Sequence, residues 1–245
     1  MIEDGQSPGA DGDGGVEESS DRRSEDGDQK KGSFWKELPI LLGVAILVAV
    51  VVRTFVVQTY YIPSGSMETT LEIDDRVLVN KLVYNFSEPD RGDIVVFRAP
   101  ESWRSNLEDD EFIKRVIAVG GDHVVCCDAD GRITVNDEPL EEDGYLYADP
   151  ITGDRNVPSL DPFDLVVPEG RLWVMGDHRQ ASGDSRQRFK DTCTELPYTP
   201  TCGDAVGSTI DVDDVIGKAF VLFWPFENFA WFSEPETFED VPDPA

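Results

Sequence analysis

The 245-residue sequence is poor in the residues that build metal centres and disulfide scaffolds. It contains four cysteines, none of them in a CxxC pair, and two histidines. Four cysteines are too few to hold a fold of this size together, and structural zinc sites take their ligands from cysteine and histidine. We therefore expect no metal site and a fold that depends on an apolar core.

Basic residues are scarce as well. The chain carries 21 Lys and Arg against 50 Asp and Glu, which gives a formal charge of −29. Such an acidic surface repels phosphate groups, so nucleic acid is not an expected partner. The hydrophobic content of 40% argues against a chain that is disordered throughout. The 21 glycines and 16 prolines favour a turn-rich β domain over a helical bundle.

Large apolar residues are almost absent from residues 1–33, which are rich in Gly, Asp and Ser. A segment of this composition cannot bury enough apolar surface to form a core. We expect residues 1–33 to be a disordered acidic tail.

One long apolar run follows this tail. Residues 38–52 form 15 consecutive residues without a charge, fewer than the roughly 20 that span a bilayer. Continuing through Arg53 and Thr54 to Val57 gives 20 residues, and an arginine near one end can reach the interface. A buried helix of a soluble protein is the alternative. We predict a single transmembrane helix, with residues 34–57 as the membrane anchor.

The residues around this run predict its orientation. No A-x-A-like cleavage site follows it, so the segment is expected to remain attached. Lys30, Lys31 and Lys36 precede the run closely, whereas only Arg53 lies close after it. The positive-inside rule then places the N-terminus in the cytoplasm and residues 58–245 outside the cell membrane.

The rest of the chain has the alternating and β-branched runs of strands, separated by turn signals such as Gly120-Gly121-Asp122. No long helical pattern competes with them. We predict strands over residues 76–84, 93–98, 111–119, 123–127, 132–136, 164–167, 171–176 and 217–224.

Residues 63–67, PSGSM, are the first candidate for chemistry. Pro63 fixes its own φ angle, and Gly65 permits a tight turn. Such a turn can present one hydroxyl group and one backbone N–H together, although most Ser-Gly-Ser sequences are ordinary loops.

Lys114 is the second candidate. On a strand over residues 111–119, Phe112, Lys114 and Val116 share one face. A lysine between two apolar residues either discourages pairing at a sheet edge or is desolvated and loses its proton near neutral pH. A neutral lysine can serve as the general base of a serine nucleophile.

The third candidate is residues 176–186, GDHRQASGDSR, which follow an apolar strand. They form either a surface turn with local ion pairs or a scaffold that orients catalytic groups. His178 beside Asp177 also raises the possibility of a Ser/His/Asp triad with Ser66, but a triad is defined by positions in space and not by neighbouring letters.

Together, the anchor and these three motifs resemble the bacterial type I signal peptidases, which are Ser/Lys leader peptidases. The resemblance extends to about Pro225. It implies a mostly β fold, in which a second β region at about 120–168 is inserted into the catalytic sheet core of the domain 58–245. It also implies removal of signal peptides from secretory preproteins at Ala-x-Ala-like sites, at the lipid bilayer and without a cofactor.

The resemblance assigns roles to individual residues. Ser66 is the implied nucleophile and Lys114 its general base, while the Ser64 hydroxyl and the Ser66 N–H form the oxyanion hole. Ser182 is expected to orient Lys114. The remaining implied roles are structural support from Asp184, Ser185 and Arg186, and small substrate pockets lined by Ile62, Pro63, Phe112 and Ile113.

The sequence departs from the family pattern in places. Glu68 and Thr69 follow Met67 where the family often has Met-Pro, and His178 stands where it often has Asn. Residues 187–216 look like an insertion.

The cysteine pairing stays open at this stage. Cys193 and Cys202 could close a small loop, whereas Cys126 and Cys127 are neighbours on a predicted strand and should face opposite sides.

Two other functions are compatible with parts of the pattern. A self-cleaving Ser/Lys peptidase of the repressor type would need a DNA-binding module and a soluble chain, which the acidic tail and the anchor disfavour. An anchored β domain that binds partners without catalysis predicts that Ser66 and Lys114 are replaceable.

Overall fold

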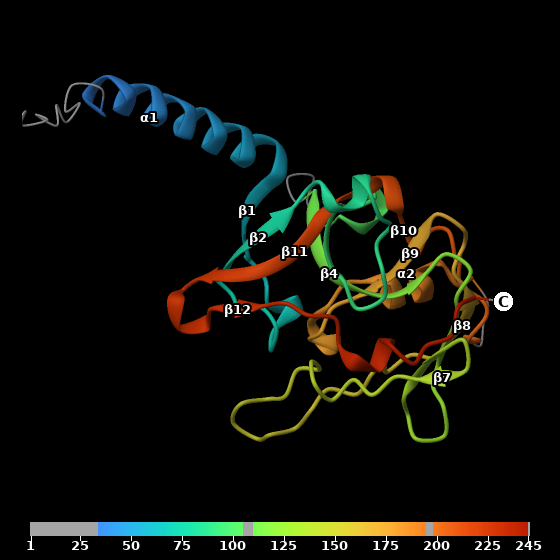
Figure 1. Ribbon diagram of the computed structural model, residues 1–245. Coiled ribbons are helices and arrows are strands. Elements are labelled where there is room, and N and C mark those ends of the chain that lie inside the picture. Colours follow the sequence, from blue (N-terminus) through green and yellow to red (C-terminus); the bar gives the residue numbers. More distant parts are fainter. Residues whose placement is uncertain (1–33, 105–109, 195–197, 245) are drawn as a thin grey trace, which may run out of the picture. The chain divides into compact units, whose positions relative to one another are not determined.

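The computed structural model describes residues 34–104, 110–194 and 198–244, and the predicted tail 1–33 lies outside them. The chain divides into two compact units, residues 1–45 and 46–245. Figure 1 shows the described elements in chain order.

The first described element is helix α1 (Phe34–Val51), which continues into a π-helical turn over Val52–Val56. All side chains described from Glu37 to Arg53 are exposed, including Ile40 (68%) and Leu47 (63%). Within the described part of the chain, no helix combines the length and the apolar character needed to cross a membrane.

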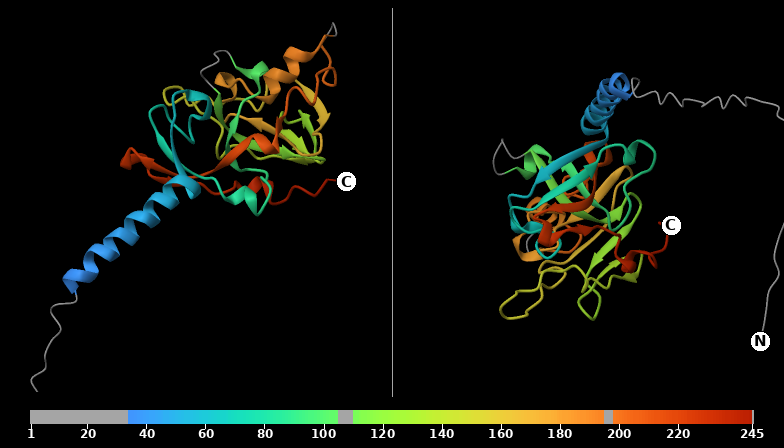
Figure 2. Two further views of the ribbon diagram at one scale, coloured as in Figure 1. Left: turned by 90° about the horizontal axis from the view of Figure 1, so that it is seen from above. Right: turned by 60° about the vertical axis from the view of Figure 1, so that its left-hand side comes forward.

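Most of the remaining strands form one antiparallel sheet with the order β1-β2-β11-β3-β4-β9-β10, and β12 pairs with β11. Figure 2 shows this arrangement from two other sides. The strands are β1 (Val57–Tyr61), β2 (Arg76–Asn80), β3 (Ile94–Arg98), β4 (Glu111–Val119), β9 (Arg171–Met175), β10 (Ile210–Asp211), β11 (Val215–Trp224) and β12 (Ala230–Trp231).

A second antiparallel sheet is formed by the chain between β4 and β9. Its order is β7-β6-β5-β8, from β5 (His123–Cys126), β6 (Ile133–Val135), β7 (Glu138–Pro139) and β8 (Phe163–Val166). The two ends of this segment are joined, because the Gly121 N–H donates to the Val167 carbonyl at 2.9 Å and the Val167 N–H donates to the Asp122 carbonyl at 2.8 Å.

The prediction of a mostly β fold is confirmed, and every strand expected from the sequence is present within a few residues. The strands that were missed are β1, which directly follows the apolar run, and the two-residue strands β7, β10 and β12. Helix α2 (Ser185–Thr192) was also missed. It begins where a polar loop was expected, because Asp184 caps its N-terminus by accepting from the Arg186 N–H at 3.2 Å.

Three clusters of buried apolar side chains pack against the two sheets. The cluster next to the candidate nucleophile joins Ile62, Met67 and Leu71 to side chains of β2, β3 and β11. A second cluster packs the smaller sheet and α2 against β9 through Trp173, and a third covers the opposite side of β3 and β9. The turn that carries Ser66 is therefore held on a packed core.

The aromatic segment 226–232 could lie in the core or on a surface that touches lipid headgroups, and its apolar character slightly favours the core. In the structure Phe226 is 74% exposed and Trp231 is 69% exposed, whereas Phe232 packs against an apolar cluster. Strand β12 is only two residues long and pairs with β11, and both of its side chains are exposed.

Both cysteine pairs are disulfide-bonded. Cys193 and Cys202 close the loop that was considered from the sequence, with a Cα–Cα distance of 5.1 Å. Cys126 and Cys127 are bonded to each other, so the expectation that they face opposite sides is wrong. Strand β5 ends at Cys126, and the alternation of side chains does not extend to Cys127.

Candidate active site

Ser66 lies in a single 3-10 turn, Gly65–Met67, directly after β1. The chain entering this turn is held on both sides, since the Ile62 N–H donates to the Asp75 carbonyl and the Asp74 N–H donates to the Ile62 carbonyl, each at 2.9 Å. The side chain of Met67 is fully buried on the other side of Ser66. Two apolar anchors thus fix the position of a hydroxyl group that is itself almost buried.

Lys114 reaches this turn from the middle of the larger sheet. Strand β4 pairs with β3 on one side and β9 on the other, with Lys114 opposite Val95. The Lys114 Nζ lies 2.7 Å from the Ser66 Oγ and donates to the Ile113 carbonyl at 2.9 Å. The fold therefore brings together two side chains that are 48 positions apart in the sequence.

Burial changes the acidity of Lys114. It lowers the pKa of the Lys114 ammonium from 10.5 to about 8, while the negative charges of Asp184 and Asp177 act in the opposite direction. The positive charge of Arg186 lowers the pKa of Lys114 further. An amine with a pKa near the working pH can both accept and return a proton, which is what a general base and acid must do.

Ser64 and the Ser66 backbone lie on the same short segment. Ser64 is exposed and extended, with φ −133° and ψ 151°. The Ser66 carbonyl accepts a hydrogen bond from the His178 N–H at 3.2 Å, which joins the turn to the loop after β9.

Gly176 makes the close contact between that loop and the turn. A Cβ atom at this position would lie 2.3 Å from the Ser66 carbonyl oxygen and 2.3 Å from the Ser182 Oγ, so only glycine fits. The Ser182 hydroxyl is buried there, and none of the described hydrogen bonds joins it to Lys114.

Asp184 ties the same loop to its neighbours. It accepts from the Gly176 N–H at 3.0 Å and forms a buried ion pair with Arg186 at 2.7 Å, while Ser185 accepts from the Val174 N–H at 3.0 Å. Burial alone would raise the pKa of Asp184, but Arg186 and the backbone donor hold it below its usual range. Asp184, Ser185 and Arg186 thus attach the loop to β9.

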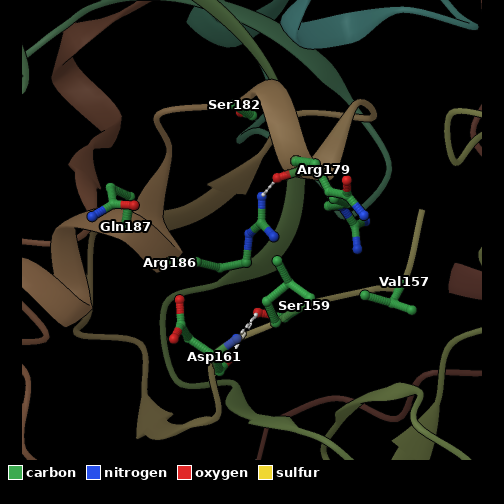
Figure 3. Close-up of a pocket in the computed structure, with 9 residues that line it drawn as sticks. Val157, Ser159, Asp161, Arg179, Ser182, Arg186 and Gln187 are labelled. Atoms are coloured by element: carbon green, nitrogen blue, oxygen red, sulfur yellow. Dashed lines mark hydrogen bonds between the residues drawn. The ribbon is translucent and has the colours of Figure 1, made fainter. Parts of the chain in front are cut away.

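Figure 3 shows Arg186 in a small pocket of about 120 Å³ beside this loop, where its guanidinium donates to the Arg179 carbonyl at 2.8 Å. Ser182 lines the same pocket, whereas Ser66 and Lys114 do not.

The comparisons with known proteins show the family of this chain. The family model described as "Signal peptidase, peptidase S26" matches residues 35–224. The chain belongs to this signal peptidase family. The predicted identity as a serine endopeptidase is thereby confirmed.

Several relatives carry the family name. The chain is 38% identical over 233 residues to a probable signal peptidase I of Mycobacterium leprae (strain TN), covering 80% of this chain and 78% of the relative. It is 35% identical over 254 residues to signal peptidase I of Mycobacterium tuberculosis (strain ATCC 25618 / H37Rv), covering 89% and 81%. A crystal structure of a signal peptidase I from Enterococcus faecalis V583 is 26% identical with a TM-score of 0.37, covering 54% of this chain and 97% of that chain.

The residues predicted to line the substrate pockets of this signal peptidase family member lie shortly before Ser66 and Lys114 in the sequence. Ile62 is buried and Pro63 is exposed at the entrance to the turn. Phe112 and Ile113 are half-buried on β4 and pack into different apolar clusters.

Two buried ion pairs near the signal peptidase motifs were not predicted from the sequence. The Arg115 guanidinium donates to both carboxylate oxygens of Asp177, at 2.9 and 2.7 Å. Arg179 pairs in the same way with Glu142. The Arg115–Asp177 pair could have been suspected from Arg115 itself, which follows Lys114 on a strand predicted to be apolar. A buried arginine requires an acidic partner.

Proposed function

We propose that this chain removes signal peptides from secretory preproteins, with Ser66 as the nucleophile and Lys114 as the general base. One observation carries the proposal: the buried Lys114 Nζ lies 2.7 Å from the Ser66 Oγ, and its pKa is lowered to about 8. The names of the relatives support the choice of substrate.

In the acylation step, the neutral Lys114 amine takes the proton of the Ser66 hydroxyl as the Oγ attacks the carbonyl carbon of the scissile peptide bond. The negative charge that develops on the carbonyl oxygen is stabilised by the Ser66 N–H and the Ser64 hydroxyl. The Lys114 ammonium then gives its proton to the leaving nitrogen. The mature protein departs with a new amino terminus, and the signal peptide stays bound to Ser66 as an ester.

Deacylation repeats these proton transfers with water. Lys114 takes a proton from a water molecule, whose oxygen attacks the ester carbonyl. As the second tetrahedral intermediate collapses, the Lys114 ammonium gives its proton to the Ser66 Oγ, and the signal peptide leaves as a carboxylic acid that loses its remaining proton to solvent. Lys114 thus ends the cycle neutral, as it began.

The substrate preference follows from the segments before the catalytic pair. We assign the binding of the residues before the cleaved bond to Ile62, Pro63, Phe112 and Ile113. We propose that these side chains form small pockets that accept the small residues of an Ala-x-Ala site. The role of Ser182 in orienting Lys114 stays a prediction, since none of the described hydrogen bonds joins the two side chains.

We also propose that residues 34–57 anchor the domain 58–245 to the cell membrane, with the N-terminus in the cytoplasm. Helix α1 and the turn after it form a helical path over residues 34–56, and the apolar side chains described from Leu38 to Val52 are exposed. Ser66 follows Val57 by nine residues, which can span no more than about 30 Å. The exposed aromatic side chains of Trp224, Phe226 and Trp231 suit contact with lipid headgroups.

The test is cleavage in detergent of a preprotein with an Ala-x-Ala site by the wild type, Ser66→Ala and Lys114→Met. We expect both variants to lose activity by a factor of about 10³ or more, as when one member of a catalytic set is removed. Lys190→Met, which removes an exposed lysine that pairs with Asp161, is the matched control and should retain activity.

The other outcomes separate the alternatives. A folded Lys114→Met variant with wild-type activity would assign the base to another residue, and His178→Ala would be tested next. A folded wild type that cleaves no preprotein over a range of pH and salt would favour an anchored binding domain.

A further inference from the structure

The two places where the motifs depart from the family pattern, Glu68 and His178, contact each other in the structure. The His178 Nδ1 lies 2.8 Å from the Glu68 Oε2 and 3.2 Å from the Gly65 carbonyl oxygen. One face of the ring is covered by Tyr147, whose ring centroid is 3.8 Å away at an interplanar angle of 16°. The imidazole is therefore held by a stacked ring and by two oxygen atoms.

These contacts determine where the imidazole carries its proton. A carbonyl oxygen and an ionised carboxylate can only accept hydrogen bonds. Because Nδ1 faces one oxygen of each kind, Nδ1 must be the protonated nitrogen. The single Nδ1–H is thus shared between the Glu68 Oε2 at 2.8 Å and the Gly65 carbonyl oxygen at 3.2 Å.

The Gly65 carbonyl matters because of the peptide group to which it belongs. The Gly65 C=O and the Ser66 N–H are parts of one planar trans peptide unit and point in opposite directions. Any group that fixes the direction of the Gly65 carbonyl also fixes the direction of the Ser66 N–H. His178 holds the next peptide as well, since its own N–H donates to the Ser66 carbonyl at 3.2 Å.

Glu68 completes this arrangement by covering Gly65. A Cβ atom on Gly65 would lie 2.5 Å from the Glu68 Oε1, so the absence of a side chain at Gly65 lets the carboxylate approach the turn. The Glu68 and His178 side chains are 21% and 17% exposed, so the pair is largely shielded from water that would compete for these hydrogen bonds.

We propose that His178, oriented by Glu68, is a positioning residue that aims the Ser66 N–H into the oxyanion hole. This inference rests on the proposed function, in which that N–H stabilises the tetrahedral intermediate. His178 contacts neither the Ser66 Oγ nor the substrate carbonyl in this scheme. Its effect is confined to the transition state, so the loss of its hydrogen bond should lower kcat and leave KM nearly unchanged.

The decisive variant is His178→Phe, which keeps an aromatic ring to stack on Tyr147 but has no donor. We expect kcat to fall about 10- to 100-fold, as is typical when a group that orients a catalytic element is removed. His178→Asn keeps an N–H donor and should recover most of the lost kcat. Tyr147→Phe keeps the stacking and should have wild-type kcat.

A second measurement separates positioning from packing. A peptide aldehyde forms a tetrahedral adduct with the serine hydroxyl, and its oxyanion occupies the hole. Its affinity for His178→Phe should fall by the same factor as kcat, whereas the affinity of the corresponding peptide carboxylate product should stay unchanged. Equal losses for both ligands, or equal kcat in His178→Phe and His178→Asn, would overturn the proposal.

Glu68→Ala tests the pair from its other side and serves if the His178→Phe variant does not fold. It leaves the imidazole without its carboxylate and should lower kcat less than His178→Phe does. An unchanged kcat would remove Glu68 from the proposal. If His178→Phe has full activity while Ser66→Ala and Lys114→Met have none, this inference fails and the Ser/Lys mechanism stands. If Ser66→Ala retains activity, the proposed function fails.

Discussion

Lys114 and Arg115 are neighbours on β4 and are buried to the same extent, with 4% and 3% of their surfaces exposed. Their pKa values nevertheless shift in opposite directions. Arg115 donates to both oxygens of Asp177 and to the Gly92 carbonyl. Burial opposes its charge, but the carboxylate outweighs burial and raises the pKa of Arg115. Lys114 instead faces a hydroxyl group and a carbonyl oxygen, and its pKa falls to about 8.

The comparison shows that the partner, and not burial as such, decides what a buried cation does. An ionised carboxylate at hydrogen-bond distance compensates for the lost hydration and keeps the arginine charged. A hydroxyl group compensates for only a small part of it, so the lysine gives up its proton more easily. One strand thus carries a structural ion pair and, on the next residue, a base.

The largest effect is expected from breaking the structural pair. Asp177→Asn leaves Arg115 buried without a counterion and should lower the free energy of unfolding by about 3–5 kcal/mol, measured by urea denaturation. The double variant Arg115→Met with Asp177→Leu removes both charges and should recover most of this loss. A single variant that is as stable as the wild type would contradict the proposed role of the carboxylate.

Removing the Lys114 amine should raise the free energy of unfolding, whereas breaking the Arg115–Asp177 pair lowers it. Folding lowers the pKa of Lys114 from 10.5 to about 8, so the unfolded chain binds the proton more tightly than the folded one. With 1.36 kcal/mol for each pKa unit, this difference lowers the free energy of unfolding of the wild type by about 3 kcal/mol below pH 8. The loss disappears as the pH rises towards 10.5. Lys114→Met should therefore be more stable than the wild type at pH 7 and lose this advantage at high pH.

Chemical denaturation of the wild type and Lys114→Met from pH 7 to about pH 10.5 tests the sign of this stability difference. A Lys114→Met variant that is less stable than the wild type at pH 7 would show that the amine contributes more through its contact with Ser66 than it loses through burial.

The smallest expected effect is a shift in the pH dependence of activity. For the wild type, kcat/KM should rise with pH and level off above a midpoint near the Lys114 pKa of about 8. Arg186 lowers the pKa of Lys114, so Arg186→Gln should move the midpoint to higher pH. Arg132→Gln, at an arginine paired with Asp128 on the smaller sheet, should leave the midpoint in place. A midpoint that Arg186→Gln does not move would contradict the electrostatic coupling.

The sequence was sufficient for what depends on local pattern. The runs of alternating and β-branched residues predicted β4 and β9, and the order of the motifs predicted Ser66 and Lys114 as a pair. It was not sufficient for contacts that exist only after folding. Arg115 and Asp177 are 62 positions apart, and an acidic chain offers Arg115 many equally plausible partners. The contact between Glu68 and His178, 110 positions apart, could not be predicted from the sequence for the same reason.

The errors have related causes. Helix α2 was missed because its eight residues carry almost no apolar pattern, and its start depends on the Asp184 cap. For the aromatic segment 226–232, hydrophobicity alone did not decide between the core and the surface, because it does not indicate whether a second layer covers a strand.

The paired ends of the smaller sheet have a consequence for how this protein can change over time. The chain leaves the larger sheet at Asp122 and returns at Val167, where two backbone hydrogen bonds close the segment. Residues added or deleted at the turns beyond this closure do not alter the register between β4 and β9. Evolution can therefore lengthen or shorten the outer part of this segment while Lys114 on one side of the closure and the loop after β9 on the other keep their positions.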